Sequence, residues 1–345
     1  MSKIWIISDT HFGVRNNSKK WEELMRSWTE ETFLPLVDSE KEEGDVLIHL
    51  GDVFDNRQSV CLSSMSLAID FFERLSTRFD KIWILCGNHD AYYTNRNDIT
   101  SIECFKHIPH VSIVKTPQLE TIFGKKMLLL PWIENKREFN KSVYSFSPEI
   151  LFCHAEFYGC TMNASKVCSD SDLDIPNIVK IYSGHIHHRQ KYKNVTYIGS
   201  PYQLTQNDRN NNKGVWTYDP QKDEERFYFN CKSPEFMRMK YQSITEMTLQ
   251  EFKQTCSNKF VEIETEHSLM AKCQFQKLLS LVQDSNIMDL SFVPAKSSQN
   301  DENDINISNC VSITEMLEKY IDEFVYCDED TKKSVRQISK KLINE

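Results

Sequence analysis

Five short apolar runs of this chain end in side chains of the kinds that bind metal ions in proteins. Each run has the length of a β-strand and stops at a glycine or a polar turn, which is typical of a buried strand. The runs cover residues 3–8, 46–50, 82–86, 150–153 and 179–182. Helical patterns separate the first three of them. The order strand–helix–strand–helix–strand therefore predicts a layered α/β fold with a site at the strand ends.

The segments between and after these runs are predicted to form helices and further strands. Residues 19–43 have the apolar periodicity of a helix, which Pro35 is expected to interrupt, and residues 61–78 are predicted to form a second amphipathic helix. Further strands are expected at residues 127–131, 195–199 and 215–218. These strands would continue the sheet.

The first two runs each end in an acidic residue. Asp9 and His11 are two residues apart, so in an extended backbone their side chains point to the same side. On its own, this pair is better explained by a turn aspartate beside an unrelated surface histidine. Asp52 follows the second run, where a carboxylate can bridge two cations with its two oxygens. His49 lies inside that run and is expected to be a packed core residue.

The third run ends in Gly87, and three polar side chains follow it. Asn88 offers a neutral oxygen ligand, and His89 can exchange a proton near neutral pH. Asp90 is predicted to hold the imidazole of His89 in a useful orientation. The fourth run ends in His154, another candidate ligand.

The fifth run is followed by three histidines. His185 and His187 repeat the two-residue spacing seen after the first run, and His188 would point the other way. We therefore include the first two in the candidate site and leave His188 out.

The strand-end residues together form a candidate ligand set: Asp9, His11, Asp52, Asn88, His154, His185 and His187. Carboxylate, imidazole and amide groups without thiolate suit manganese, iron or zinc better than magnesium. Such a set is too large for one cation and suits two that share Asp52. Two cations can activate a water, bind phosphate oxygens and support an in-line displacement, and His89 could protonate the leaving oxygen. The pattern predicts a phosphoester hydrolase.

The pattern changes after the first domain, which we place at residues 1–230. Residues 231–294 are predicted to form a small α/β accessory domain, with strands at 260–263 and 288–293, a helix at 268–283 and an ordinary surface histidine at His267. Residues 295–311 are rich in Ser, Asn and Asp and are predicted to be a linker. Residues 312–345 are predicted to form two amphipathic helices. Such helices either pack back on the core or dock on a partner.

Composition narrows the class of protein further. A net charge of −9 is not that of a protein held on nucleic acid by overall charge, so any DNA binding must use local basic groups, cations or a partner. No apolar run reaches the roughly 18–20 residues of a membrane span, and residues 1–4 lack a signal peptide's apolar segment. The eleven cysteines include no Cys-x-x-Cys pair, so we expect neither a disulfide framework nor a zinc knuckle. A cytoplasmic location is expected.

The ordered motifs resemble those of a known family. Asp-x-His, Gly-Asp, Gly-Asn-His-Asp, a single strand-end His and Gly-His-x-His, over residues 3–220, resemble the calcineurin-like metallophosphoesterase superfamily. Residues 51–55 and 197–201 look like the SbcD branch, the nuclease subunits of SbcCD DNA-repair complexes, rather than the protein phosphatases. Residues 201–205 look most like the recombination nuclease subunits of T-even phages, which would place the chain in a host cytoplasm.

This resemblance implies a four-layer α/β/β/α sandwich with a capping domain and a carboxy-terminal helical segment. It implies that Asp9, His11, Asp52 and His187 hold one metal ion, that Asp52, Asn88, His154 and His185 hold the other, and that His89 is catalytic. It further implies two divalent ions, Mn²⁺ or alternatively Mg²⁺, exonuclease action on double-stranded DNA and endonuclease action on single strands. The resemblance also implies a homodimer bound to an SMC-like ATPase of the SbcC type, which together form a heterotetramer. In this assembly the carboxy-terminal helices would bind the coiled coil of the ATPase.

Two alternatives remain at this point. A phosphatase or phosphodiesterase for non-DNA esters would share the metal site and lack the partner-binding tail. A non-catalytic scaffold is disfavoured, because every expected ligand and His89 are present.

Overall fold

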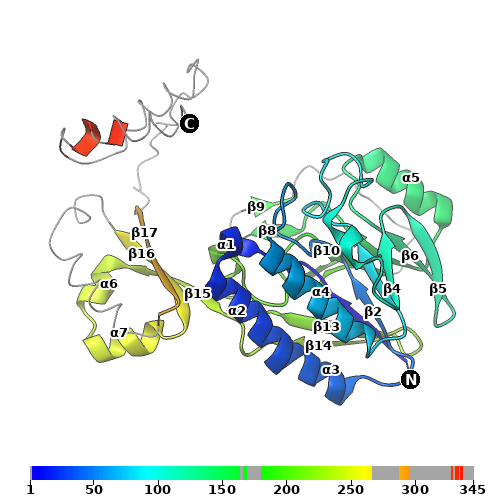
Figure 1. Ribbon diagram of the computed structural model, residues 1–345, viewed down its shortest axis with the longest axis horizontal. Helices are drawn as coiled ribbons and strands as arrows, with labels where there is room; N and C mark the ends of the chain where they lie inside the picture. The colour runs from blue at the N-terminus through cyan, green and yellow to red at the C-terminus, as the bar shows by residue number, and fades with distance from the viewer. Residues whose placement is uncertain are drawn as a thin grey trace. The chain divides into compact units, whose positions relative to one another are not determined.

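The computed structural model describes residues 2–163, 166–168, 180–265, 287–294, 328, 331–333 and 335–336. The chain forms two compact units, Met1–Phe236 and Met237–Glu345 (Figure 1). The expected helix at 268–283, His267 and the expected linker at 295–311 lie outside the described residues, as does most of the segment 312–345. No helix in the described part of the chain is long and apolar enough to cross a membrane.

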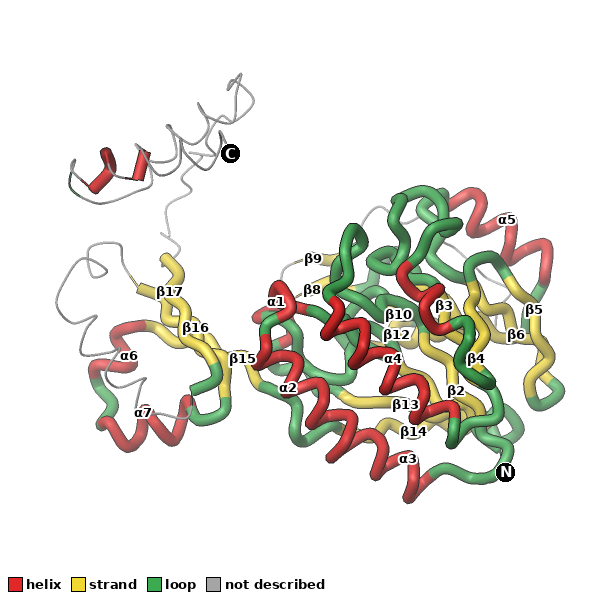
Figure 2. The backbone as a smooth tube through the Cα atoms, in the orientation of Figure 1, coloured by secondary structure: helices red, strands yellow, loops and turns green. Residues whose placement is uncertain are grey.

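The first unit contains two six-stranded sheets (Figure 2). The first sheet has the order β14-β13-β1-β2-β3-β4, with β1 to β4 parallel and with β13 and β14 antiparallel at one edge. Its strands are β1 (Ile4–Ile7), β2 (Val46–His49), β3 (Ile82–Leu85), β4 (Val111–Val114), β13 (Gly214–Asp219) and β14 (Glu224–Phe229).

The second sheet also has a core of four parallel strands. Its order is β11-β12-β10-β7-β6-β5, with four parallel strands in the middle and an antiparallel strand at each edge. Its strands are β5 (Gln118–Ile122), β6 (Lys125–Leu130), β7 (Ile150–His154), β10 (Lys180–Gly184), β11 (Gln190–Tyr192) and β12 (Val195–Tyr197). A separate two-stranded ribbon consists of β8 (Thr161–Asn163) and β9 (Lys166–Val167).

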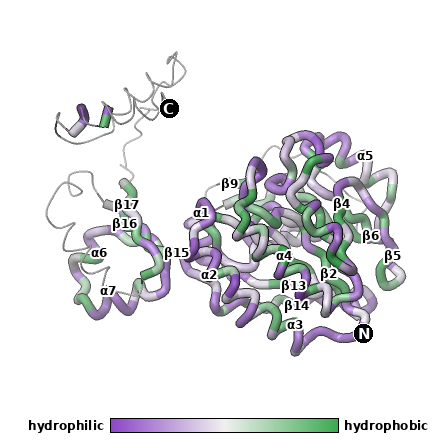
Figure 3. The backbone as a smooth tube through the Cα atoms, viewed as in Figure 1, coloured by the Kyte–Doolittle hydropathy of each residue, from purple (hydrophilic) through white to green (hydrophobic). Residues whose placement is uncertain are grey.

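The two sheets pack face to face through alternating side chains. Ile4 and Ile6 of β1 belong to one buried cluster together with Phe152 of β7 and Tyr182 of β10. The intervening residue Trp5 points to the other face, where its ring contacts Phe79. Figure 3, in which the backbone is coloured by residue hydropathy, shows that hydrophobic residues are concentrated in these central strands. The core therefore lies between the sheets, and each sheet keeps a second apolar face for helices.

Helices cover both outer faces. On the first sheet lie α2 (Lys19–Trp28), α3 (Leu34–Glu40) and α4 (Leu62–Ser76), and on the second lies α5 (Lys136–Phe146), anchored by Phe139 and Val143 (Figure 1). The expected four-layer α/β/β/α order is confirmed. Three shorter helical segments are α1 (Val14–Asn17), Ser101–Phe105 and Gln206–Asp208.

The helix expected at residues 19–43 is not interrupted at Pro35. A π-helical segment, Thr29–Phe33, connects α2 to α3, and Pro35 lies in the first turn of α3. Proline has no N–H to donate, and here it follows a π-helical turn in which Leu34 N–H reaches the Thr29 carbonyl; such a turn lets a helix continue past a gap in its hydrogen-bond ladder. The expectation of a break was therefore wrong.

Over the residues that the structure describes, the second unit has a three-stranded sheet and two short helices. The sheet contains β15 (Glu235–Lys240), β16 (Lys259–Thr265) and β17 (Asp289–Pro294), and the helices are α6 (Tyr241–Thr245) and α7 (Leu249–Cys256). Strands β16 and β17 are parallel and coincide with the two strands expected there. Thr248 and Glu251 form a capping box at the start of α7, and Phe252 of this helix packs into the small core of the unit.

Candidate metal centre

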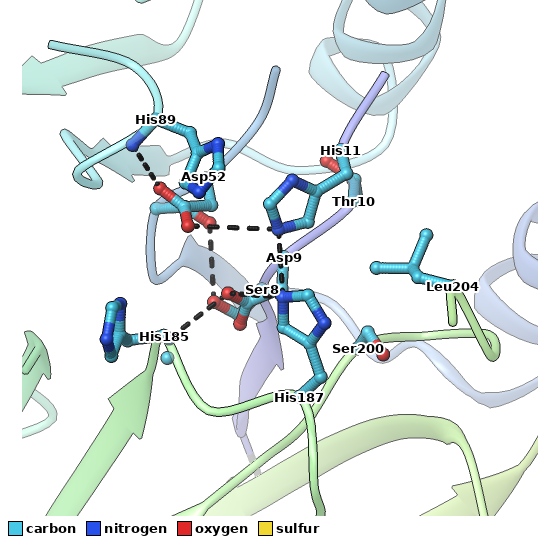
Figure 4. Close-up of polar contacts among 12 residues, drawn as sticks. Ser8, Asp9, Thr10, His11, Asp52, His89, His185, His187, Ser200 and Leu204 are labelled. Atoms are coloured by element: carbon cyan, nitrogen blue, oxygen red, sulfur yellow. Dashed lines mark hydrogen bonds and ion pairs between the residues drawn. The ribbon is translucent and has the colours of Figure 1, made fainter. Parts of the chain in front are cut away.

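The seven predicted ligand residues come together at the carboxyl ends of five strands. Strands β1, β2 and β3 of the first sheet and β7 and β10 of the second lead into them. Because the strands are parallel within each sheet, these ends meet at one edge of the sandwich. Figure 4 shows part of this arrangement, with side chains from both sheets converging.

One group of ligand atoms comes from Asp9, His11 and His187, and its atoms lie within 4.8 Å of one another. The Nε2 atoms of His11 and His187 are 3.0 Å apart, and an Asp52 oxygen lies 3.7 Å from His11 Nε2. The buried Oδ2 atom of Asp9 has no hydrogen-bond partner among the described residues. An unpartnered buried carboxylate oxygen beside two imidazoles suits a divalent cation. We call this group, with Asp52, the first metal position.

A second group comes from Asp52, His154 and His185, again within 4.8 Å. His154 Nε2 lies 3.3 Å from Asp52 Oδ2. The side-chain oxygen of Asn88 lies 3.0 Å from His154 Nε2 and 2.7 Å from His185 Nδ1. We call these four residues the second metal position. Since Asp52 Oδ2 is close to a histidine of each position, Asp52 has the placement expected of a bridging carboxylate.

Oxygen atoms outside the two positions orient the rings of the second one. The Nδ1 of His154 lies 2.8 Å from the carbonyl oxygen of Leu50, and the Nε2 of His185 lies 2.8 Å from a carboxylate oxygen of Glu156. In each ring the other nitrogen then faces the metal position, and it is this nitrogen that would bind a metal ion once its proton is lost. Glu156 was not predicted from the sequence, where its only signal is that it follows His154 by two residues.

Asp55 does the same for the first position. Its carboxylate lies 3.2 Å from His11 Nδ1, so the Nε2 of His11 faces His187. The ligand atoms of His11, Asp55 and His89 also lie within 4.8 Å of one another. Asp55 was not predicted as a site residue, although it follows Asp52 by three residues.

Burial and the charges of the site shift the pKa values of the histidines in opposite directions. Burial alone would lower the pKa of His11, but the hydrogen bond to Asp55 and the nearby carboxylates outweigh it and raise that pKa to about 9. Burial would also lower the pKa of His154, but the charge of Asp52 and the hydrogen bond to it outweigh burial and raise that pKa to about 9. Burial and the charge of His11 lower the pKa of His187 to about 4. Without metal, the site therefore holds protons on His11 and His154 near neutral pH.

The backbone at the site differs from the expected extended geometry. Asp9 and His11 have φ values of 53° and 46°, and Asp52 and His185 have 53° and 79°. These left-handed conformations cost on the order of 1–3 kcal/mol each at residues other than glycine. Asp9 and His11 thus reach one site because the chain turns, and the prediction of a shared strand face was wrong. A Cβ atom at Gly87 would lie 2.2 Å from the Asp52 backbone nitrogen, so only glycine fits there.

His89 lies beside the first metal position. Its ring centroid is 5.0 Å from that of His11, and its backbone N–H donates to Asp52 Oδ1 at 2.8 Å. Its Nδ1 lies 2.5 Å from the carbonyl oxygen of Asp55. The imidazole is thus held by a backbone carbonyl, and the expectation that Asp90 orients it was wrong.

Asp90 has a structural position instead. Its buried carboxylate accepts hydrogen bonds from the backbone N–H groups of Val53, Phe54 and Gly87, at 3.0, 3.1 and 2.9 Å. Burial and the charge of Asp52 raise the pKa of Asp90 to about 6. Asp90 therefore ties the turn after β2 to the turn after β3.

The other histidines and the cysteines that the structure describes belong to none of the ligand clusters of the centre. His49 is fully buried, 3.1 Å from the hydroxyl of Thr10, and its ring packs against Phe72. Among the described residues, neither His49 nor His188 belongs to a cluster of ligand atoms. The cysteines that the structure describes are all free.

Two sandwiched sheets with carboxylate, imidazole and amide groups at their shared edge define a metal-dependent phosphoester hydrolase. The model of the calcineurin-like phosphoesterase family matches residues 2–189, and the chain belongs to this family.

Similar proteins include viral ones. The chain is 27% identical to Exonuclease subunit 1 of Enterobacteria phage T4 over 233 residues, which cover 66% of this chain and 68% of that protein. It is 29% identical to 078R of Invertebrate iridescent virus 3, described as a phosphoesterase, over 58% of this chain and 57% of that protein. Among solved structures, an archaeal phosphodiesterase aligns with 66% of this chain and 99% of its own at 16% identity, with a TM-score of 0.37.

Proposed function

We propose that this chain is the nuclease subunit of a DNA-processing complex and hydrolyses DNA phosphodiester bonds with two divalent cations, preferably Mn²⁺. The observation that carries the DNA part is the similarity to Exonuclease subunit 1 of phage T4. The SbcD-like motifs at residues 51–55 and 197–201 support the same proposal. The proposed activities are exonuclease action on double strands and endonuclease action on single strands, in recombination and repair.

The proposed chemistry follows from the placement of the side chains. Bound at the two positions, the cations would activate a water and offset the phosphate charge. Asp52 would hold both, as its distances to His11 and His154 allow. His89, beside the first position, would protonate the leaving oxygen or stabilise its charge.

Cleavage assays test this proposal. The full chain with Mn²⁺ is incubated with linear duplex DNA, single-stranded DNA and a generic phosphodiester such as bis-p-nitrophenyl phosphate. We expect all three to be cleaved, and Asp52→Asn to abolish every activity. Asp45→Asn is a matched control, because Asp45 is an equally buried aspartate whose partners, Lys3 N and Trp5 Nε1, lie outside the centre.

The alternative is a phosphodiesterase for small esters. It is favoured by the net charge of −9 and by the relative described only as a phosphoesterase. Turnover of the generic ester without cleavage of either DNA would replace our proposal with this one.

We also propose a homodimer bound to an SMC-like ATPase of the SbcC type through residues 312–345. The apolar periodicity of that segment supports the partner, and the chain lacks the Gly-x-x-x-x-Gly-Lys-Ser/Thr motif of an ATPase. A chain ending at residue 311 should keep Mn²⁺-dependent cleavage and lose the ATPase in a pull-down. Retention of the ATPase would give the segment another role.

A further inference from the structure

Residues 199–213 form a segment that contacts the backbone on both sides of the first metal position. We call it the positioning segment. It lies beyond residues 2–189, which the family model matches. In Figure 4, Ser200 of this segment lies beside His187, and its backbone N–H donates to the His187 carbonyl at 3.4 Å.

Tyr202 provides the first of these contacts. Its hydroxyl donates to the backbone carbonyl of Thr10 at 2.5 Å, and both residues are buried. Thr10 stands between Asp9 and His11, so this bond fixes the peptide that joins two ligands. The Tyr202 ring is held in turn by an edge contact with Trp28, 5.3 Å between centroids. A buried hydroxyl needs a partner, and here the partner is the ligand loop itself.

Lys213 provides the second contact. Its side chain is fully buried, and its Nζ donates to the backbone carbonyl of His187 at 2.5 Å, to Ser200 Oγ at 3.0 Å and to Asp208 Oδ1 at 2.6 Å. The three donors of the ammonium group are thus all used. A charge is buried in this way only when it is paired, and Asp208 supplies the pair.

Asp208 connects this lysine to the rest of the segment. Its other oxygen accepts from the backbone N–H groups of Leu204 and Thr205, at 3.1 and 2.9 Å. Gly199, with φ of 74°, allows the close approach, because a Cβ there would lie 2.8 Å from the His187 carbonyl oxygen. The segment is therefore held by its own hydrogen bonds, and it lies in close contact with the backbone carbonyl of His187.

We propose that Tyr202 and Lys213 are positioning residues that set the affinity of the first metal position, by fixing the backbone carbonyls of Thr10 and His187. The second position is held by other groups: Asn88, Leu50 and Glu156 orient its histidines. Loss of either contact therefore weakens one cation selectively. The inference rests on the two-metal part of the proposed function and is independent of the DNA substrate.

Tyr202→Phe is the sharpest test, because it removes one oxygen and keeps the ring. The metal-free full chain is titrated with MnCl₂ by calorimetry, and the manganese is followed by electron paramagnetic resonance. We expect two sites in the wild type and a spin-coupled pair at two equivalents. In Tyr202→Phe we expect one site to weaken about 10- to 100-fold and the coupled signal to require excess manganese.

Tyr218→Phe is the matched control. Tyr218 is also buried, and its hydroxyl bonds Asp223, away from the metal positions. We expect both of its manganese sites to match the wild type. Comparable melting temperatures of the two variants would separate positioning from a loss of folding. Recovery of cleavage by Tyr202→Phe at saturating Mn²⁺ is a further expected result.

Lys213→Met with Asp208→Asn tests the second contact without leaving a charge unpaired. It should weaken the same single site. Two unchanged sites in Tyr202→Phe, or equal weakening of both, would overturn the inference while the proposed function stands. A wild-type chain that binds fewer than two Mn²⁺ would instead overturn the two-metal proposal itself.

Discussion

The Nε2 atoms of His11 and His187 lie 3.0 Å apart, although 176 positions separate the two residues in the chain. Two imidazole nitrogens at this distance need one proton between them. The carboxylates around His11 raise its pKa to about 9, whereas burial and the charge of His11 lower the pKa of His187 to about 4. His11 is therefore the donor, and a proton lies where the first cation would bind.

This relationship predicts that loading the metal releases protons. The pKa values of His11 and His154 are both about 9 without metal, so each imidazole is protonated at pH 7.5 and must lose its proton to bind a cation. The apparent affinity for Mn²⁺ should therefore rise with pH, by up to about tenfold per pH unit for each proton, and level off above about pH 9. Calorimetry at pH 7.5 in buffers of different ionisation enthalpy should count about two protons released. Loading without proton release would contradict the assignment.

His89 is expected to act on the substrate rather than to hold a metal ion. Its ring is fixed by the Asp55 carbonyl beside the first metal position. His89→Ala should lower kcat for phosphodiester cleavage by about 10²- to 10⁴-fold, the usual contribution of a general acid. Elemental analysis should still find two metal ions per chain. His107→Ala, at an exposed histidine outside the ligand clusters, serves as the control, and a metal content of one in the His89 variant would make His89 a ligand.

Asp90 is expected to affect stability first. Asp90→Ala removes the acceptor of three backbone N–H groups that join the turns after β2 and β3. Each unpaired buried donor costs about 1–3 kcal/mol, so for three donors we expect a loss of about 3–9 kcal/mol in the free energy of unfolding, measured in urea. Asp98→Ala, at an exposed aspartate of the following loop, should change it by less than about 0.5 kcal/mol. A stable Asp90→Ala chain with altered pH dependence of kcat would restore the role first expected for Asp90.

The convergence of the seven candidate ligand residues at the strand ends was predictable from the sequence, but the details of their geometry were not. Parallel strands bring their carboxyl ends to one edge, so a polar residue after each apolar run is enough to locate the site. The left-handed backbone at Asp9 and His11 is imposed by neighbours, such as the Gly51 carbonyl that accepts from Asp9 N, and no local pattern announces it. Edge strands such as β5 and β14 are half polar and were missed for that reason.

The carboxylates of Asp55 and Glu156, which lie beside the ligand histidines, were not predicted for a related reason. Asp55 and Glu156 follow ligands in irregular turns, where periodicity says nothing of direction. Only the folded chain shows that Glu156 accepts from His185 Nε2 at 2.8 Å and that the Asp55 carboxylate lies 3.2 Å from His11 Nδ1, each histidine coming from another strand end. Such contacts depend on tertiary structure alone, and they decide which nitrogen faces the metal.

Glu156 gives a prediction for the second metal position. Its carboxylate accepts from His185 Nε2 at 2.8 Å, so that Nδ1, 2.7 Å from the Asn88 oxygen, is the nitrogen that faces the second metal position. Glu156→Ala should weaken one Mn²⁺ site by about 10- to 100-fold, with the other site unchanged, as measured by calorimetry. Glu156→Gln keeps an oxygen acceptor in nearly the same place and should recover most of that affinity. If glutamine proves as harmful as alanine, the negative charge of Glu156 matters more than the tautomer that it selects.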